Sequence, residues 1–454
     1  MGVHKNREGE IVRFKARLCA RGFTQVKGDD YNEIFSPTSR YDSIRVLLSI
    51  AARDGLQIEQ FDVKTAFLYG ELSEDIYMEV PEGLETQSLK VCKLVKSIYG
   101  LKQSSRCWNE KFCSFLSIYG FKPCPSENCV FVGHFKDVKV ILILYVDDGL
   151  LLARSKVVLS EILKIFMQTF EIKIVDYNSF VGMKTDRGKD YISISQSQYI
   201  KTIINRFNFS DAKGSSTPAD VNVKVSKNTV SDEPVNFPYR EAVGALLFLS
   251  SISRPDIAYA VNVVSRYVNN AGPSHVTAVK RILRYLINSK DMCIVYQGNV
   301  ELVGYSDSDF AGDMDTRKSN TGYIFLMNGG PVTWFSRKQN TVALSTTESE
   351  YMAASEAAKE ILWLRQFLCD IGEPQSSITL NVDNQSAIKL INNPVFHRRS
   401  KHIDIRYNFI RENVAKKIVN IRYVESSNQL VDFLTKALPA NKFNSIRDKM
   451  MRKV

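Results

Sequence analysis

Apolar residues recur at helical spacing and at strand spacing in alternation along residues 1–210. Residues 40–54 carry an apolar stripe at helical spacing, which Gly55 is placed to end. Residues 57–63 predict a short strand. Two dense runs of Leu and β-branched residues flank the Val-Asp-Asp-Gly at 146–149 and predict a hairpin with a tight turn.

The middle of the chain begins with a polar stretch, residues 211–239, whose three prolines and many Ser, Asn and Lys predict a linker. Residues 241–288 return to a helical pattern, with Ser274 as the expected N-cap of the last helix. Three cations of that helix form either a solvated face or a nucleic-acid contact, and the pattern leaves both open. They are Lys280, Arg281 and Arg284.

From about residue 300 two strand-like runs precede a long helix over residues 343–372, a strand and a short helix. This order is typical of a mixed α/β domain of about 140 residues. We therefore expect an α/β (α+β) chain divided at the following boundaries. The ranges are 1–210, 211–299, 300–440 and a basic tail at 441–454.

Composition narrows the class of protein. The 454 residues are 44% hydrophobic and 24% charged, which excludes collagen-like and wholly disordered chains. Sixty Lys and Arg against 49 Asp and Glu give a net charge of +11, which hints at a polyanionic partner. Eight cysteines form no CxxC pair, and no signal core or uninterrupted apolar span is present. We expect a soluble, intracellular protein with reduced thiols and no membrane partner.

A pair of acids interrupts the most apolar part of the chain. Asp147 and Asp148 follow the run ILILYV, and Asp62 lies near the end of the strand predicted at 57–63. An exposed turn is one explanation, because Asp-Asp-Gly suits a turn. If the strands are neighbours, however, the three carboxylates meet at one end of a sheet. Such a cluster needs cations, and oxygen ligands suit Mg²⁺, two of which support phosphoryl transfer.

Three motifs occur in order along this part of the chain: FDVKTAFLYGELSEDIYMEVPEG, SIYGLKQSSRCW and LYVDD. They resemble the reverse transcriptase of copia-type LTR retrotransposon Pol polyproteins. The resemblance implies a palm-type RNA-directed DNA polymerase with fingers and thumb, a helical connection and a C-terminal ribonuclease H-like domain. It implies that Asp62, Asp147 and Asp148 hold two Mg²⁺ ions, for which Mn²⁺ substitutes. The implied partners are an RNA template, a DNA primer and deoxynucleoside triphosphates.

The same resemblance assigns a nucleotide-binding set. Phe67 matches the aromatic residue that excludes a 2′-hydroxyl, and Gln103 matches a glutamine near the nucleotide sugar. Lys15, Arg17 and Arg21 match a basic fingers segment facing the triphosphate, although a solvated edge strand is an open alternative. Alternation along a strand would place Lys15 and Arg17 on one face.

A second acidic set follows in the last third of the chain and resembles the ribonuclease H domain of the same family. Its members are expected on a strand, the long helix, a strand end and a C-terminal helix, where two cations would support hydrolysis. They are Asp307, Glu350, Asp383 and Asp432, with Asp309 and Glu348 as open alternatives for the first two. Residues 396–422, with eight Lys and Arg against two acids, are expected to grip an RNA–DNA hybrid.

The chain also departs from the family pattern. Met1 falls inside the fingers of the family's polymerase, Ser105 replaces a common Pro, and Asn109 replaces a usual aromatic residue. The alternative function is therefore an inactive retrotransposon remnant or a repurposed nucleic-acid-binding protein. The sequence leaves open the oligomeric state, the primer, and whether the compartment is the cytoplasm, a virus-like particle within it, or the nucleus.

Overall fold

A computed structural model describes most of the chain. It covers residues 2–5, 11–83, 90–227, 236–392 and 401–453, without the side chains of 2–5, 11–15 and 401–407. The fold divides into two compact units. The N-terminal unit comprises residues 1–39 and 57–176, and the C-terminal unit comprises residues 40–56 and 177–454. None of the helices within the described ranges is long and apolar enough to cross a membrane.

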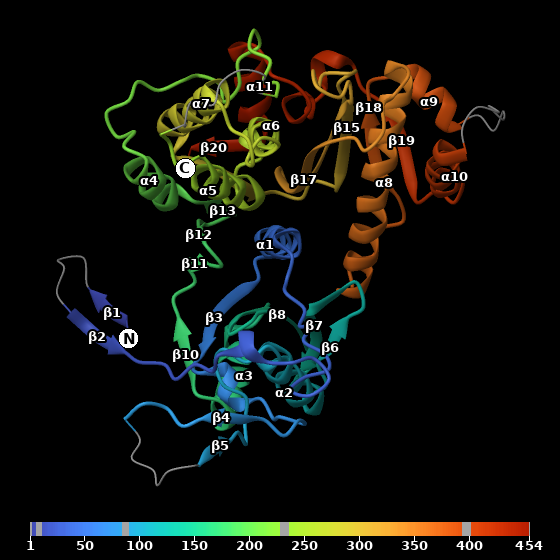
Figure 1. Cartoon of the computed structure of the whole chain (residues 1–454). Helices are drawn as coiled ribbons and strands as arrows, with labels where there is room; N and C mark the ends of the chain where they lie inside the picture. The colour runs from blue at the N-terminus through green and yellow to red at the C-terminus, as the bar shows by residue number, and fades with distance from the viewer. Residues whose placement is uncertain (1, 6–10, 84–89, 228–235, 393–400, 454) are drawn as a thin grey trace. The chain divides into compact units, whose positions relative to one another are not determined.

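The N-terminal unit is built on a six-stranded antiparallel sheet in the order β10-β3-β9-β8-β7-β6. Two short hairpins, β1–β2 and β4–β5, accompany it (Figure 1). The strands are β1 (Gly2–Lys5), β2 (Ile11–Lys15), β3 (Gln57–Val63), β4 (Tyr77–Glu79), β5 (Val91–Lys93), β6 (Lys122–Cys124), β7 (Glu127–Phe135), β8 (Val138–Tyr145), β9 (Asp148–Ala153) and β10 (Ile172–Val175). The helices are η1 (Gly22–Thr24), η2 (Ala66–Tyr69), α2 (Ser104–Ile118) and α3 (Lys156–Thr169).

The predicted strand at 57–63 and the predicted hairpin are confirmed as β3 and as β8 with β9. An aromatic core holds the two helices to the sheet: Phe61 of β3 lies 5.7 Å from Phe166 of α3, between ring centroids, and 6.5 Å from Phe112 of α2. All three rings are buried. Packing of this kind fixes the sheet end at which β3 and β9 place their acids.

The first predicted helix, α1 (Tyr41–Asp54), forms as expected and ends at Gly55, whose φ of 64° suits glycine. It belongs to the C-terminal unit. Its buried Arg45 donates hydrogen bonds to the carbonyls of Val332 (2.7 Å) and Ile252 (2.8 Å). The guanidinium also lies 3.9 Å from the ring centroid of Trp334. This arginine therefore ties a segment from early in the chain to elements 207 and 287 residues later.

A five-stranded sheet in the order β11-β12-β13-β14-β20 forms one part of the C-terminal unit. Its strands are β11 (Ser179–Phe180), β12 (Met183–Arg187), β13 (Tyr191–Ser195), β14 (Met292–Gln297) and β20 (Met451–Lys453). The helices of this part are α4 (Ser197–Arg206), α5 (Tyr239–Ile252), η3 (Pro255–Ile257), α6 (Ala258–Ser265), α7 (Pro273–Ser289) and α11 (Ala440–Met450). The pairing of β13 with β14 joins the beginning of the unit's second stretch, which starts at residue 177, to a strand about 100 residues later.

A mixed sheet in the order β17-β16-β15-β18-β19 forms the other part. β15 is antiparallel to β16 and parallel to β18, and α8 packs on all three (Figure 1). The strands are β15 (Val303–Ser308), β16 (Asn320–Met327), β17 (Gly330–Lys338), β18 (Ile378–Val382) and β19 (Val419–Tyr423). The helices are α8 (Thr346–Asp370), α9 (Gln385–Asn392), α10 (Lys401–Ala415), η4 (Ser426–Asn428) and η5 (Asp432–Leu434). The α/β class and this order of elements are as predicted.

Two local expectations were wrong. Helix α7 begins at Pro273 with Gly272 as its N-cap, so Ser274 lies inside the first turn. Proline is well suited to the first position of a helix, because the backbone N–H that it lacks would have no acceptor within the helix there. Asp432 lies on a three-residue 3₁₀ helix, η5, and not on an α-helix.

Candidate catalytic centres

Three acids of the C-terminal unit converge on one point. Asp307 lies on β15, Glu350 on α8, and Asp383 just after β18. One carboxylate oxygen from each lies within 4.8 Å of the other two. Asp307 and Glu350 are buried and Asp383 is half-buried. The pairing of β15 with β18, together with the packing of α8 across both strands, brings the three elements together.

Neighbouring donors hold these carboxylates in place. The backbone N–H of Ser308 donates to Oε1 of Glu350 at 3.2 Å, and the hydroxyl of Ser426 donates to Oδ2 of Asp383 at 2.8 Å. The Thr435 hydroxyl donates to Oδ2 of Asp307. Each acid therefore has a fixed orientation.

The charge of this cluster is poorly compensated. Burial, with a further contribution from Asp432, raises the pKa of Asp307 to about 6 despite the nearby Lys436. Burial and the adjacent Asp307 raise the pKa of Glu350 well above its usual range. Oε2 of Glu350 is buried and meets no N–H or O–H donor among the residues that the structure describes. Carboxylate oxygens that repel one another, one of them without a hydrogen-bond donor, fit a divalent cation such as Mg²⁺.

Asp432 is close to this cluster but is neutralised differently. Its Oδ1 lies 2.9 Å from Nζ of Lys436, and its Oδ2 pairs with Lys442. Lys436 also lies 3.5 Å from Oδ2 of Asp307, so one ammonium group stands between the two aspartates. Burial opposes protonation of Lys436, but both carboxylates outweigh it and raise its pKa. Lys436 was not identified from the sequence. Its position four residues after Asp432 is the pattern that could have indicated an ion pair between the two.

The two alternative acids have other partners. Asp309 lies in the loop after β15, where it accepts a hydrogen bond from the backbone N–H of Asn320 at the start of β16. Glu348 is part of the N-terminal turn of α8, where its Oε2 accepts from the N–H of Leu344 at 2.7 Å. Among the described residues, neither belongs to the group within 4.8 Å.

The acids of the N-terminal unit meet at the end of β3 and β9. Asp62 pairs directly with Asp148 across these antiparallel strands. The N–H of Val63 donates to the backbone carbonyl of Asp147 at 2.9 Å, so Asp147 lies beside the same strand end. Burial, Asp147 and then Asp62 raise the pKa of Asp148 to about 6. Within the described residues these acids do not reach the 4.8 Å spacing of the other cluster.

The turn that carries Asp147 is held by backbone geometry and one side chain. Val146 has a φ of 60°, in the left-handed region that a β-branched residue rarely adopts. The indole N–H of Trp108 donates to the carbonyl of Val146 at 2.7 Å. Since strained backbone persists only where its surroundings fix it, this hydrogen bond positions the acidic turn.

Part of the expected nucleotide-binding set gathers around Tyr99. The rings of Phe67 and Tyr99 lie 5.0 Å apart between centroids. The guanidinium of the exposed Arg17 lies 5.1 Å from the centroid of Tyr99. Tyr99 thus connects two predicted residues, and its place in the motif SIYGLKQ is the signal that could have identified it.

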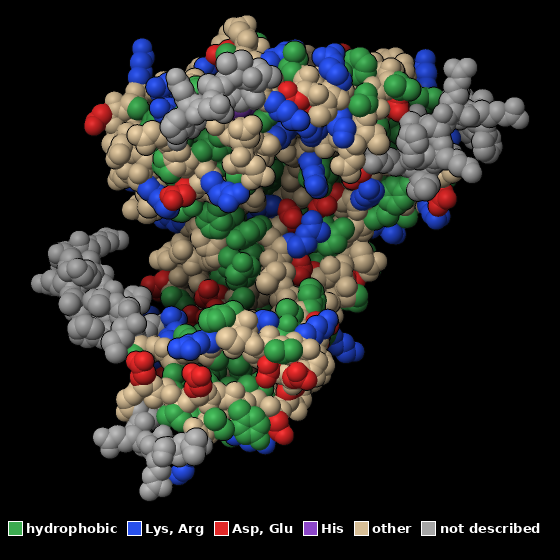
Figure 2. Space-filling model, in the orientation of Figure 1, with side chains coloured by type: hydrophobic (Ala, Val, Ile, Leu, Met, Phe, Trp, Pro, Cys, Tyr) green, Lys and Arg blue, Asp and Glu red, His purple; other side chains and the backbone are tan. Residues whose placement is uncertain are grey.

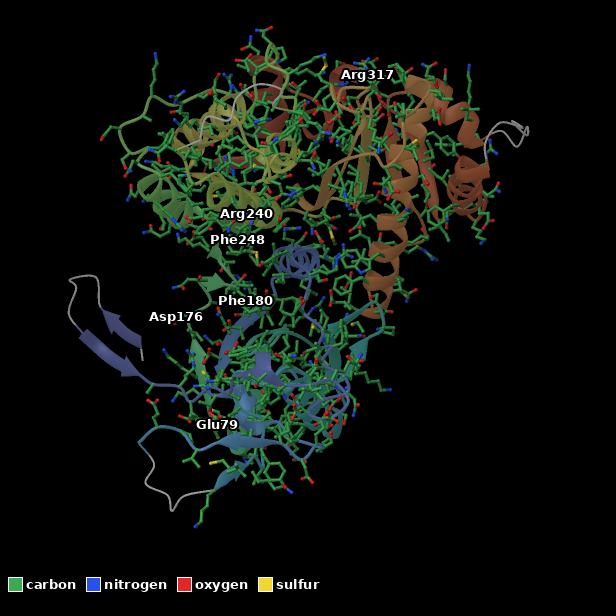
Figure 3. All side chains as sticks on the ribbon, viewed as in Figure 1. Glu79, Asp176, Phe180, Arg240, Phe248 and Arg317 are labelled. Atoms are coloured by element: carbon green, nitrogen blue, oxygen red, sulfur yellow. The ribbon has the colours of Figure 1, made fainter. Side chains whose placement is uncertain are left out.

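The other members lie elsewhere. Gln103 is buried and donates to the carbonyl of Asp30 at 2.9 Å while accepting from Gln25 at 3.1 Å. Arg21 is exposed and lies 3.7 Å from Glu79, which Figure 3 labels. Strand β2 ends at Lys15, so Arg17 does not share a strand face with it, and the Lys15 side chain is outside the described residues. The basic segment at 396–422 also begins outside them.

Comparisons with known proteins match nearly the whole chain. Residues 2–221 match the family described as reverse transcriptase (RNA-dependent DNA polymerase). The "Retrovirus-related Pol polyprotein from transposon TNT 1-94" of Nicotiana tabacum is 43% identical over 459 residues, which covers 98% of this chain and 35% of that protein. The "Putative transposon Ty5-1 protein YCL074W" of Saccharomyces cerevisiae is 31% identical over 308 residues, 66% of this chain and 100% of that protein.

Among solved structures, the foamy viral protease-reverse transcriptase in complex with double-stranded DNA aligns with 87% of this chain and 61% of its own. The TM-score is 0.49 and the sequence identity is 11%. The chain spans about a third of the length of the curated polyproteins from transposons TNT 1-94 and RE2.

Proposed function

Because the chain belongs to the family of Pol polyproteins from copia-type retrotransposons, we propose that it joins an RNA-directed DNA polymerase to a ribonuclease H. The polymerase would extend a DNA primer on an RNA template with deoxynucleoside triphosphates. The ribonuclease H would remove the RNA strand of the resulting hybrid. The corresponding domains are residues 1–210, 211–299 and 300–440, followed by the tail at 441–454.

The observation that carries the hydrolytic half is the convergence of Asp307, Glu350 and Asp383 within 4.8 Å. A buried acidic group of this kind, with the donorless oxygen of Glu350, gains stability from a divalent cation. We assign Asp432 as the fourth acid of the same centre, since its charge acts on Asp307. Lys436 and Lys442 hold its carboxylate beside the acidic cluster.

The polymerase half rests on Asp62, Asp147 and Asp148 at one end of the N-terminal sheet. The elevated pKa of Asp148 reflects burial and two neighbouring carboxylates, a setting that a cation relieves. When bound, magnesium supplies positive charge that offsets the acids in either centre and stabilises the attacking and leaving oxygens.

The residues around Tyr99 would receive the incoming nucleotide. The flat ring of Phe67 would exclude a ribose 2′-hydroxyl, and Arg17 would contact the triphosphate. Arg21 and Lys15 would supply further positive charge to the triphosphate. Gln103 is a positioning residue in this proposal, because its hydrogen bonds fix the loop at residues 25–30.

Primer extension on an RNA template with Mg²⁺ or Mn²⁺ tests the polymerase. The wild-type chain should extend the primer, and Asp147→Asn should not. Asp137→Asn, an exposed aspartate in another hairpin turn of the same sheet, is the matched control and should extend normally. Tight hybrid binding without extension by any of the three would instead favour the nucleic-acid-binding alternative.

Cleavage of an end-labelled RNA in an RNA–DNA hybrid tests the nuclease separately. Asp383→Asn should abolish cleavage, whereas Asp211→Asn, at an exposed site outside the cluster, should not. Cleavage that survives Asp383→Asn would remove this centre from the proposal and leave the polymerase assignment untouched.

A further inference from the structure

A cavity of about 750 Å³ lies in the C-terminal unit beside the carboxylate centre. Its walls come from residues 212–225, from α6 and α7, and from the loop between β15 and β16 that contains Arg317, labelled in Figure 3. Cavities of roughly 300–1,000 Å³ are typical of sites for small molecules and cofactors. The size alone therefore admits a ligand as large as a nucleotide.

The lining is strongly cationic, with seven Lys and Arg against three Asp. Figure 2 shows Lys and Arg side chains gathered on the visible face of the C-terminal unit. Several of the lining cations have no carboxylate partner among the residues that the structure describes. They are Lys213, Lys224, Arg284 and Lys318. Unpaired positive charge around a hollow attracts an anion.

Two arginines of the lining are held in place by aspartates. Arg266 is fixed by Asp313 at 2.9 Å, and Arg281 is fixed by Asp220 at 2.8 Å. Both line the cavity, and within the described part of the chain each keeps a buried Nε–H group without an acceptor. A buried donor without an acceptor is costly, and an anionic oxygen would satisfy it. Guanidinium groups held in this way are well suited to phosphate.

The rest of the lining mixes apolar side chains with Ser, Thr and Asn, and it includes the rings of Tyr259 and of Phe310, which is 47% exposed. A phosphate binds the cations, whereas a flat base stacks on an aromatic ring. We infer that this cavity binds a nucleotide through its terminal phosphate, with the base against the aromatic wall.

The cavity and the carboxylate centre share one side chain. Lys436 lines the cavity and also pairs with Asp307 and Asp432. The nucleotide therefore comes from one of two sources, a free mononucleotide or the phosphorylated end of a strand beside the centre. The inference does not depend on the proposed hydrolysis, because binding is measurable without divalent cations.

Equilibrium binding to the full chain in EDTA tests the inference with three probes. These are adenosine monophosphate, a 5′-phosphorylated tetranucleotide and the same tetranucleotide with a 5′-hydroxyl. We expect saturable binding, at one site per chain, that requires the phosphate. Binding of the mononucleotide identifies a free ligand, and binding of the phosphorylated tetranucleotide alone identifies a strand end. Equal binding of the two tetranucleotides, with no binding of the mononucleotide, overturns the inference.

Charge reversal locates the site. The double variant Arg284→Glu, Lys318→Glu should weaken binding about tenfold or more, because two cations are replaced. Lys201→Glu, on the exposed face of α4 and outside the cavity, should change it less than about twofold. Phe310→Ala, which alters no charge, should weaken binding several-fold if the base stacks there. Equal affinities of the Lys201 variant, the double variant and the Phe310 variant would exclude this cavity, and thermal melting checks that each variant is folded.

Discussion

At the scale of single residues, buried carboxylates occur in two settings, one neutralised by cations and one not. Asp432 is held by two lysine ammonium groups, whereas Glu350 faces Asp307 with a donorless oxygen. The first arrangement stabilises the fold directly. The second destabilises it in the absence of a cation, because two acids oppose each other in a buried site. Of the four acids assigned to the hydrolytic centre, Asp307 and Glu350 therefore destabilise the folded state, whereas Asp432 is stabilised by its ion pairs.

Asp307→Asn is expected to raise stability while abolishing RNA cleavage. The folded pKa of about 6 lies above the ordinary value of 3.8, so the stability contributed by protonated Asp307 is present below pH 4 and is lost as pH rises through 6. In EDTA at pH 8 the variant should unfold with a free energy about 1–3 kcal/mol higher than wild type.

Chemical denaturation between pH 5 and pH 8 measures this difference. The gain should shrink toward pH 5, where wild-type Asp307 takes up a proton. Asp211→Asn, at an exposed site, is the control and should leave stability unchanged at both values. A variant less stable than wild type at pH 8 would contradict the unfavourable charge assigned to Asp307.

Phe67→Val is expected to relax sugar discrimination. Removing the ring next to Tyr99 opens space for a 2′-hydroxyl, so ribonucleotide incorporation relative to deoxynucleotide should rise roughly tenfold to a hundredfold. Single-nucleotide extension on an RNA template measures the ratio. Leu68→Val, at the next and more exposed position, should keep the wild-type ratio.

At the scale of elements, the position of helix α1 depends on specific side-chain contacts with distant parts of the chain. Its buried face carries Arg45, whose guanidinium donates to three backbone carbonyls, those of Val332, Ser251 and Ile252. Ser49 of the same helix accepts a hydrogen bond from the side chain of Asn328 at 3.0 Å. These contacts place α1 against β17 and the end of α5, within the C-terminal unit.

Arg45→Met is expected to destabilise the C-terminal unit by about 3 kcal/mol or more. The substitution keeps most of the side-chain length but leaves buried carbonyls without their donor and removes one of the two arginine partners of Asp42. Thermal or urea unfolding of the full chain measures the loss. Arg240→Met on α5, labelled in Figure 3 and exposed, should cost less than about 0.5 kcal/mol.

At the scale of the whole molecule, the chain passes between the two units three times. It leaves the N-terminal unit after residue 39, returns at 57 and leaves again after 176. The C-terminal unit is therefore assembled from two separate stretches of sequence. Cutting the chain once at residue 177 removes α1 from the unit that it stabilises.

A fragment of residues 177–454 is therefore expected to be unstable, and a peptide of residues 40–56 added in trans should raise its melting temperature. The reason is that α1 satisfies buried carbonyls and covers apolar surface of that unit. Differential scanning fluorimetry with increasing peptide concentration measures the shift. The same peptide with Arg45→Glu should give no shift, and equal melting with and without the native peptide would show that the unit does not need α1.

Local patterns predicted the elements, but not their partners. The span of β3, the hairpin of β8 and β9, and the end of α1 at Gly55 follow from spacing and turn chemistry. The assignment of α1 to the C-terminal unit depends on side-chain contacts across some 280 residues, which no local pattern contains. Among site residues, Asp307, Glu350 and Asp383 were expected together and lie together. The pairing of Asp432 with lysines depends on packing around η5 and was not foreseen.

The return of the chain to the N-terminal unit after residue 56 also constrains recombination between related retrotransposons. A recombination breakpoint anywhere between residues 57 and 176 joins α1 of one parent to the later strands of another. The arginine at 45 then meets a foreign Trp334, and the serine at 49 meets a foreign Asn328. A hybrid of two diverged sequences should therefore be stable only when both contact pairs are inherited unchanged. The residues of α1 and their partners at 328 and 334 should accordingly evolve together.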